Sequence, residues 1–301
     1  MSDTMVFAVV VTYNGMQWVD RCMGSLCQSV VPVSVVVVDN ASTDGIVQYI
    51  QQNYPDVHVI ETGSNSGFAK ANNLGIRYAL DHGADYVFLL NQDAWLNETD
   101  GIRRMLSVFE RESNIGIVNP INMNGLNTAL DDEYATDMPG SFVSDMYMGT
   151  IKEYYSTHYI NAAAWLMSAA CIRKVGGFDT NMFVHYGEDN NYCHRTVYHQ
   201  FKIMICTQCT ICHDKEYRRG KEQAYRDRNF KQRDLSDRIF WGNINVKVDV
   251  DGMLKSLKRS ILWNSITLRF WKIKRFKTQQ QFYRMVKLSR TENSKGGMVW
   301  L

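Results

Sequence analysis

Two runs of β-branched residues restrict most strongly what this chain can fold into. VFAVVVT (6–12) and VSVVVVD (33–39) are almost entirely apolar, a pattern typical of parallel strands that are buried on both faces. A segment with helical periodicity separates them. A short strand, a helix over 67–83, an apolar strand over 85–91 and a helix over 99–112 follow. This alternation predicts an α/β fold with an open, mostly parallel central sheet flanked by helices.

Polar residues directly follow three of the predicted strands. They are Thr12-Tyr13-Asn14, Asp39-Asn40 and Asn91-Gln92-Asp93. The carboxyl ends of parallel strands meet at one edge of a sheet, and the ligands of such sheets bind there. Three polar clusters on one edge therefore predict a site for a polar ligand.

The chain lacks the glycine-rich loops that usually bind nucleotide phosphates. No G-x-G-x-x-G follows the first strand and no G-x-x-x-x-G-K-[ST] occurs, which argues against NAD binding and excludes a P-loop NTPase. A nucleotide at this edge would need another source of positive charge for its phosphates. A divalent cation held by Asp93 would supply that charge.

The stretch ICTQCTICHD (205–214) has the spacing of a metal site and contains the haem-attachment pattern C-x-x-C-H. No fourth cysteine follows Cys212, as an iron–sulfur cluster would require, and no second pair of zinc ligands is present. The preceding FKIMIC is typical of a strand, on which side chains three residues apart face opposite sides. We expect the cysteines to pack as small apolar side chains, and the role of His213 is open at this point.

Positive charge is concentrated near the carboxyl end of the chain. The net charge is only +2 over 301 residues, but segment 255–290 contains eleven Lys or Arg and no Asp or Glu. The segment also contains aromatic residues, namely Trp263, Phe270, Trp271, Phe276 and Phe282. Such a cationic, mainly helical segment suits an anionic membrane surface, and the alternative is a solvated helix pair packed on the main domain. Nucleic acid is not an expected partner, because no motif that reads it is present.

Composition indicates an ordinary globular protein of the cytosol. Hydrophobic residues make up 45% of the chain and charged residues 21%, which excludes a disordered protein. Seven cysteines are too few for a disulfide scaffold of this length, and no signal peptide precedes the first strand. No apolar run is long enough to span a bilayer. We therefore expect reduced thiols and a cytoplasmic location.

The residue pattern changes beyond position 120. Segment 121–140 is polar and predicts irregular structure, and an apolar stretch follows it. Within that stretch, Trp165 is a candidate either for stacking on a sugar or for the core, and Asp179 is a candidate either for a sugar hydroxyl or for a turn. Glu188 and Asp189 then stand together at the start of a predicted helix, where acidic residues also stabilise the helix end.

Five stretches, taken in order, resemble one protein family. They are VVVTYNG, VVVDNASTDG, GSNSGFAKANNLGI, DYVFLLNQDAWL and GGFDTNMFVHYGEDNNYCHR, and together with the later His213 they cover about residues 5–213. The ordered set resembles the GT-A glycosyltransferases of family 2, which are mostly inverting, and is most similar to bacterial rhamnosyl- and related surface-polysaccharide transferases. The resemblance implies a nucleotide-sugar-binding half over 1–120 and an acceptor-binding half over 121–235. A basic, aromatic, mainly helical extension over 236–301 would follow.

The resemblance implies the residues that bind the donor. Thr12 and Asn14 would line the nucleobase pocket, Asp39 would accept a hydrogen bond from the base, and Asn40 belongs to the same cluster. The segment that passes under the nucleotide would contribute a further set, in which Lys70 could reach a phosphate: Asn65, Gly67, Lys70 and Asn73.

The resemblance also implies a metal centre and a catalytic base. Asn91-Gln92-Asp93 occupies the place of the family's D-x-D, so Asp93 is the only acidic ligand from that turn. His213 stands where the family often places a histidine that completes the shell of Mn²⁺ or Mg²⁺. Asp189 stands at the position of the base, with Glu188 as the alternative. The usual E-D-x-D phrase is E-D-N-N here, and its last carboxylate is absent.

These roles imply transfer of a sugar, with inversion, from a nucleotide-diphosphate donor to a hydroxyl of a glycan or lipid-linked acceptor in surface-polysaccharide synthesis. The enzyme would be cytoplasmic and peripheral at the inner face of the plasma membrane. The alternative is a catalytically silent protein of the same fold that binds a nucleotide sugar or a glycan. A nucleotidyltransferase is disfavoured, because VTYNGMQW is not the Gly-rich, Arg-containing loop that such an enzyme needs after its first strand.

Overall fold

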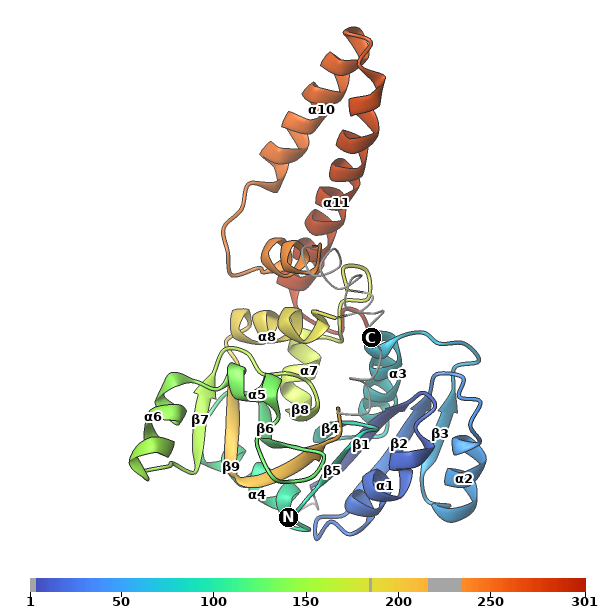
Figure 1. Cartoon of the computed structure of the whole chain (residues 1–301), viewed down its shortest axis with the longest axis vertical. Coiled ribbons are helices and arrows are strands. Elements are labelled where there is room, and N and C mark those ends of the chain that lie inside the picture. The colour runs from blue at the N-terminus through green and yellow to red at the C-terminus, as the bar shows by residue number, and fades with distance from the viewer. Residues whose placement is uncertain (1–3, 184–185, 216–233) are drawn as a thin grey trace.

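The computed structural model describes residues 4–183, 186–215 and 234–301. Its described part contains one nine-stranded sheet in the order β3-β2-β1-β4-β8-β6-β9-β5, with β7 pairing to β9 (Figure 1). The strands are β1 (Val6–Thr12), β2 (Val33–Asp39), β3 (His58–Glu61), β4 (Tyr86–Asn91), β5 (Ala94–Leu96), β6 (Ile115–Asn124), β7 (Tyr154–Thr157), β8 (Ala164–Ser168) and β9 (Lys202–His213).

Helices cover both faces of this sheet. Along the chain the helices include the short 3-10 helix η1 (Met16–Trp18), then α1 (Val19–Cys27), α2 (Ile46–Asn53), α3 (Phe68–Asp81), α4 (Gly101–Arg111), α5 (Asp132–Asp137), α6 (Gly140–Met148), α7 (Ala169–Val175) and α8 (Glu188–Tyr198). Two further helices, α10 (Val250–Ile266) and α11 (Phe270–Lys295), lie apart from the sheet (Figure 1). One core cluster lies between the sheet and α3, α7 and α8, and the other lies between the sheet and α1, α2 and α4. The fold is therefore a three-layer α/β arrangement, as predicted.

The parallel half of the sheet follows the sequence pattern closely. Strands β3, β2, β1 and β4 are parallel neighbours, and alternate residues of β1 enter opposite core clusters because successive side chains point to opposite faces. Helix α3 packs tightly on β1. A Cβ at Gly75 would lie 2.3 Å from Val9 Cγ1, so this close approach requires glycine.

The second half of the chain makes the sheet mixed. Strand β8 lies antiparallel between β4 and β6, β6 runs parallel to β9, and β5 and β7 run antiparallel to β9. Strand β6 crosses position 120, so both predicted halves share one sheet. The polar segment 121–140 is more ordered than expected, because it ends β6 and forms α5, whose Tyr134 is fully buried.

Trp165 and the three cysteines of the 205–214 stretch are buried. Trp165 is fully buried against Phe178 and Tyr192 and belongs to the core. All three cysteines of the 205–214 stretch are buried free thiols. Cys206 and Cys209 lie in the same core cluster, contrary to the expected alternation, because β9 is irregular between Cys206 and Thr210. Among the described residues, no three His, Cys, Asp or Glu side chains are grouped to hold a metal ion.

Helices α10 and α11 form a hairpin that projects from the body of the molecule (Figure 1). Its base is fixed by Asp179, whose Oδ2 accepts hydrogen bonds from Ser289 Oγ at 2.5 Å and from Asn293 Nδ2 at 3.0 Å. The chain end returns to the body, where Gly177 N donates to Val299 O at 2.8 Å. Asp179 therefore stabilises the Gly-Gly-Phe-Asp turn and the contact between this turn and α11. None of the described helices is long and apolar enough to cross a membrane.

Replacing Asp179 should destabilise the fold, because its carboxylate also accepts hydrogen bonds from the main-chain N–H groups of Asn181 and Met182. Asp179→Ala would leave the buried Ser289 and Asn293 without this acceptor and should lower the free energy of unfolding by about 3 kcal/mol. Urea denaturation measures the change. The control is Asp81→Ala, which removes an exposed ion pair with Arg77 and should cost less than about 1 kcal/mol. Equal effects of the two substitutions would contradict this assignment.

Candidate functional site

The predicted polar clusters meet at the carboxyl edge of the parallel strands. The register of β1 against β2 places Thr12 beside Asp39, and Thr12 Oγ1 donates to Asp39 Oδ1 at 2.7 Å. The other oxygen, Asp39 Oδ2, accepts a hydrogen bond from Ser42 N at 2.8 Å. Both Thr12 and Asp39 are buried. The buried Asp39 carboxylate therefore holds the end of β1 and the loop after β2 together through these hydrogen bonds.

The loop after β1 is also bonded to the loops after β2 and β4. Asn14 Oδ1 accepts a hydrogen bond from Thr43 N at 2.8 Å. Tyr13 N donates to Gln92 Oε1 at 2.9 Å, and Gln92 Nε2 donates to Tyr13 O at 3.2 Å. A Cβ at Gly15 would lie 2.2 Å from Gln92 Oε1, so a larger residue at this position would displace the Gln92 side chain. The structure thus brings all three predicted clusters together.

The segment before α3 joins the same edge through Asn40. Asn40 Oδ1 accepts hydrogen bonds from Ser66 N at 3.2 Å and Ser66 Oγ at 2.9 Å. The exposed Asn65 accepts from Gly67 N at 3.0 Å, and Gly67 has a φ of +81° that favours glycine. Lys70 follows on the first turn of α3 with an exposed side chain. These residues border the edge as predicted, with the ammonium group free to reach a ligand.

Asn73 has a different role from the predicted one. Its Oδ1 accepts a hydrogen bond from Phe178 N at 2.7 Å, and its Nδ2 donates to Phe178 O at 2.9 Å and to Trp300 O at 3.1 Å. The side chain is buried and its polar atoms are engaged by the main chain. We therefore assign Asn73 to holding α3 against the Gly-Gly-Phe-Asp turn and the chain end.

Asp93 and His213, the predicted metal ligands, lie side by side. The pairing of β5 with β9 sets Ala94 opposite His213, and His213 Nε2 lies 3.5 Å from Asp93 Oδ1. Asn91 Nδ2 lies 3.4 Å from the same ring nitrogen. On the other side, His213 Nδ1 lies 3.6 Å from Asp131 Oδ2, and Asp131 Oδ1 pairs with Lys215 at 3.1 Å. Both predicted ligands are buried.

The donor set of this pair fits a divalent cation. A carboxylate suits Mn²⁺ or Mg²⁺, and an imidazole nitrogen suits transition metals, so the pair favours Mn²⁺ over Mg²⁺. Two protein ligands would leave coordination positions for diphosphate oxygens. Asp131 was not predicted, because its pattern in the sequence is that of a helix cap. It does cap α5, since Asp131 Oδ1 accepts from Tyr134 N at 3.0 Å.

Asp189 and Glu188 lie in the first turn of α8 in different environments. Asp189 is partly exposed, and its Oδ2 accepts a hydrogen bond from Tyr159 Oη at 3.1 Å. Glu188 is 7% exposed, and its Oε2 has no hydrogen-bond partner among the described residues. Burial raises the pKa of Glu188 to about 7. Burial also raises the pKa of Asp189, although the hydrogen bonds from Asn190 N and Tyr159 partly oppose that rise.

Helix α5 connects the Asp93–His213 pair to Asp189. Its cap, Asp131, faces His213, and its last residue, Asp137, is close enough to Asp189 for the two charges to raise the pKa of Asp137. Burial is the larger cause, and together the causes bring that pKa to about 6. Six helical residues span about 9 Å, so α5 is a short link between the Asp93–His213 pair and the surroundings of Asp189. Tyr159 and Asp137 carry no sequence signal, because only the tertiary fold places them beside Asp189.

Comparison with known proteins agrees with this geometry. Residues 7–176 match the family model described as glycosyl transferase family 2. The N-acetylglucosaminyl-diphospho-decaprenol L-rhamnosyltransferase of Mycobacterium tuberculosis is 26% identical over 251 residues, which cover 74% of this chain and 80% of that protein. The low-salt glycan biosynthesis hexosyltransferase Agl10 of Haloferax volcanii is 28% identical over 187 residues, which cover 60% of this chain and only 58% of that protein.

Solved structures show the same fold at low sequence identity. The mannosyltransferase PcManGT from Pyrobaculum calidifontis, in complex with GDP-Man and Mn²⁺, aligns with a TM-score of 0.58 and 16% identity over 96% of this chain and 86% of that chain. TarS 1–349 of S. aureus, in complex with UDP, aligns with a TM-score of 0.53 and 16% identity over 69% of this chain and 60% of that chain. The fold is GT-A, and the chain belongs to glycosyl transferase family 2.

Proposed function

We propose that the chain is an inverting glycosyltransferase of surface-polysaccharide synthesis. It would move a sugar from a nucleotide-diphosphate donor to a hydroxyl of a glycan or lipid-linked acceptor. The observation that carries the proposal is the buried Asp93–His213 pair at the end of β4, together with Asp189, whose carboxylate is oriented by Tyr159. The first group suits a diphosphate with its cation, and the second suits an acceptor hydroxyl.

Transfer creates negative charge on the leaving diphosphate. A divalent cation held by Asp93 and His213 would stabilise that charge as a Lewis acid. The exposed ammonium group of Lys70 lies on the neighbouring α3 and would add positive charge near the phosphates. The loops fixed by Asp39 would hold the nucleobase at the ends of β1 and β2.

Asp189 would remove the proton of the acceptor hydroxyl as that oxygen attacks the anomeric carbon. Residue Asp189 is more exposed than Glu188, and its carboxylate is oriented by Tyr159. Asp189 is therefore the better base of the two. With Asp189 as the base, the reaction would be one direct displacement with inversion at the anomeric carbon, by analogy with the inverting glycosidases.

The names of the relatives guide the choice of donor and acceptor. Two relatives are rhamnosyltransferases, the mycobacterial protein and the dTDP-rhamnosyl transferase RfbF of Shigella flexneri, which is 25% identical over 70% of this chain. A dTDP-deoxyhexose is therefore the first donor to test. The mycobacterial name specifies a lipid-linked acceptor. An acceptor of that class supports our placement of the enzyme at the inner face of the plasma membrane, with the basic segment 255–290 toward the lipid.

Release of nucleoside diphosphate tests this function. The protein is incubated with Mn²⁺, lipid-linked glycans and dTDP-rhamnose, a UDP-hexose or GDP-mannose, and the nucleotide product and the extended glycan are separated by chromatography. We expect one donor to yield both products in equal amounts. Nucleotide binding without transfer to any acceptor would support the silent binding protein instead.

Removing the base should lower turnover but leave donor binding intact. Asp189→Asn should reduce kcat by about 10²–10⁴-fold, the usual contribution of a general base, and leave the Kd for the nucleoside diphosphate unchanged. Glu188→Gln is the matched control on the adjacent residue and should retain most activity. The reverse pattern, with Glu188→Gln inactive and Asp189→Asn active, would identify Glu188 as the base.

The hydrogen bond from Tyr159 should be visible in the pH dependence of the reaction. This bond lowers the pKa of Asp189 against the effect of burial, so Tyr159→Phe should raise that pKa. The acidic limb of the kcat/KM profile, where the base becomes protonated, should then move to higher pH. Well above that limb the variant should approach the wild-type rate. A uniform loss of activity without movement of the limb would contradict the positioning role.

The buried Glu188 should make stability depend on pH. Its pKa in the native state is raised from an ordinary 4.5 to about 7, so the native state binds more protons than the unfolded state between these values. The free energy of unfolding should therefore fall as pH rises through this window. Glu188→Gln should remove about 3 kcal/mol of that fall, as measured by urea denaturation at several pH values. The exposed Glu61→Gln is the control, and the same pH dependence in wild type and Glu188→Gln would refute the assignment.

A further inference from the structure

The far end of the α10–α11 hairpin exposes a cluster of large apolar side chains. Six residues at this end are each at least 60% exposed: Leu262, Trp263, Ile266, Leu268, Phe270 and Trp271. They come from the last turns of α10, the connection and the first turn of α11. Figure 1 shows this end as the part of the molecule farthest from the sheet. We call these six residues the hairpin tip.

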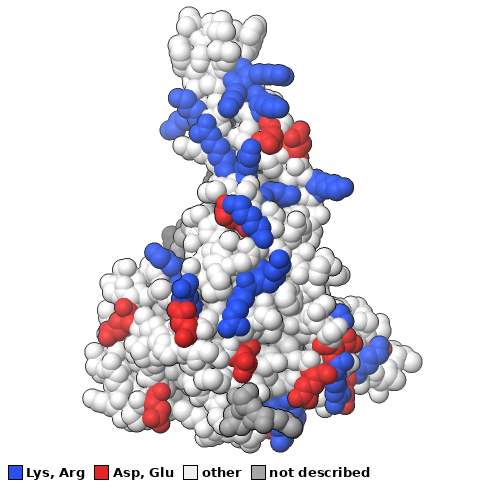
Figure 2. Space-filling view, turned by 180° about the vertical axis from the view of Figure 1, so that it is seen from behind, with Lys and Arg blue, Asp and Glu red and all other residues white. Residues whose placement is uncertain are grey.

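A collar of positive charge lies next to the hairpin tip. The exposed basic residues here are Lys255, Lys258, Arg259, Arg269, Lys272, Lys274, Arg275 and Lys277, and no acidic residue occurs over 255–290. Figure 2 shows Lys and Arg gathered along the visible face of the hairpin, with uncharged residues at the end of that face. An apolar end with a cationic collar matches the layers of an anionic bilayer, in which acyl chains lie beneath phosphate groups.

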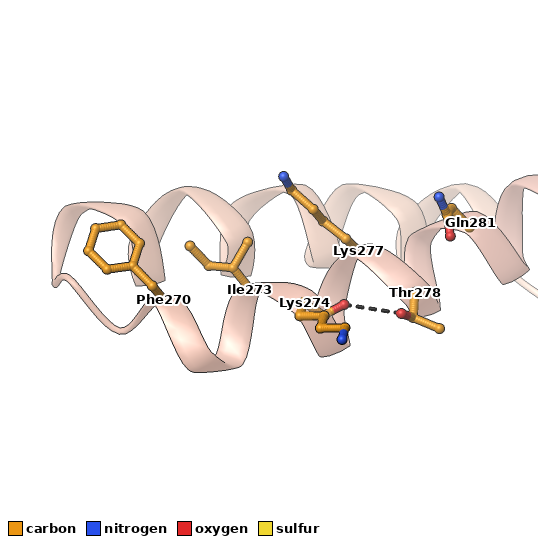
Figure 3. Close-up of a pocket in the computed structure, with 6 residues that line it drawn as sticks. All are labelled: Phe270, Ile273, Lys274, Lys277, Thr278 and Gln281. Atoms are coloured by element: carbon orange, nitrogen blue, oxygen red, sulfur yellow. Dashed lines mark hydrogen bonds between the residues drawn. The ribbon is translucent and has the colours of Figure 1, made fainter.

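One face of α11 shows the same order of apolar and then cationic residues. A surface depression is lined by six residues, all from this helix, which Figure 3 shows: Phe270, Ile273, Lys274, Lys277, Thr278 and Gln281. From the tip toward the body, the face is first apolar, then cationic and then uncharged. A helix that lies flat on a membrane would instead carry its apolar residues along its whole length. The gradient therefore favours contact through the end of the hairpin.

The hairpin is held at a fixed distance from the acceptor side of the site. Ser289 and Asn293 of α11 bind the buried Asp179, and Asn293 O lies 2.9 Å from His199 Nε2, immediately after α8. Nineteen residues separate Phe270 from Ser289, which corresponds to about 28 Å of helix. Helix α8, which carries Asp189, thus lies near the level of the hairpin base.

We propose that the hairpin tip enters an anionic lipid surface end-on and holds the catalytic face away from that surface. Interfacial apolar residues enter the membrane by roughly 5–10 Å, which leaves α8 about 20 Å from the lipid head groups. The partner of the hairpin tip is therefore a lipid bilayer. Binding to this bilayer requires both the aromatic residues of the tip and the basic collar.

This geometry also restricts the acceptor, a consequence that rests on the proposed function. An acceptor sugar attached directly to its lipid would stay near the head groups, whereas a longer glycan could reach Asp189. The substrate class is therefore a lipid-linked oligosaccharide, which differs from the single lipid-linked sugar that the name of the mycobacterial relative specifies. Equal kcat/KM values for the two acceptors would contradict the restriction on the acceptor.

Flotation with vesicles tests the lipid contact without donor or acceptor, so its outcome does not depend on the proposed function. The full chain should float with vesicles of phosphatidylglycerol and phosphatidylcholine, and less with phosphatidylcholine alone. W263S/W271S should weaken flotation by roughly ten-fold or more, because interfacial tryptophans supply much of the binding. K272Q/K274Q/K277Q should weaken it mainly at low salt.

The matched control changes exposed apolar residues on the body. Tyr147 and Met148 of α6 are 89% and 70% exposed, and Y147S/M148S should float like the wild type. Flotation of W263S/W271S at the wild-type level would overturn the proposal. So would a wild-type dimer that dissociates in W263S/W271S, because a second copy would then cover the tip.

Energy transfer from a dye on Cys27 tests the end-on orientation. Cys27 is exposed and the other six cysteines are buried, so a thiol reagent labels it selectively. It ends α1, which lies at the opposite end of the molecule from the hairpin (Figure 1). Bound protein should show little transfer to a dye on the lipid head groups. Strong transfer would mean that the body lies on the membrane and would overturn the end-on orientation.

Discussion

The register of β1 against β2 is the constraint on which the site depends. Main-chain hydrogen bonds between two buried apolar strands place Thr12 directly beside Asp39 at the last pair of the ladder. A one-residue slip would turn every buried valine of a strand to the opposite face, so the core enforces this register. Asp39 then holds the loops that follow both strands, and Gln92 extends the same network to β4. The rigid sheet therefore positions loops that have little regular structure of their own.

The donor side of this edge, which follows β1, β2 and β4, could be predicted because these strands are recognisable in the sequence as apolar runs. Each apolar run ends at a polar cluster. The sequence alone therefore indicates that Thr12, Asp39 and Asp93 lie at the carboxyl ends of strands. The acceptor side is different. Asp131 resembles a helix cap, and Tyr159 and Asp137 lie in segments of ordinary composition. They reach the site only because β9 returns to β5 and brings His213 to Asp93, while α5 spans from that pair toward Asp189.

Sequence patterns were least informative where one residue type serves two purposes. Asn73 and Asp179 stand within stretches that resemble the family, yet both form buried hydrogen bonds that fix the chain end and α11. Cys206 and Cys209 have metal-like spacing, yet an irregularity in β9 directs both thiols into one core cluster. The length of the hairpin was visible in the sequence, but the separation between its anchored base and its exposed tip is a property of the fold.

The central claim is that the carboxyl edge of β1, β2 and β4 binds a nucleoside diphosphate together with a divalent cation. The most direct test is the melting temperature of the protein with UDP, dTDP or GDP, each with Mn²⁺ and with EDTA. One nucleotide should raise the melting temperature by a few degrees only when Mn²⁺ is present, and Asp93→Ala should abolish the rise. No rise with any of the three, in protein whose fold is verified by circular dichroism, would contradict the claim.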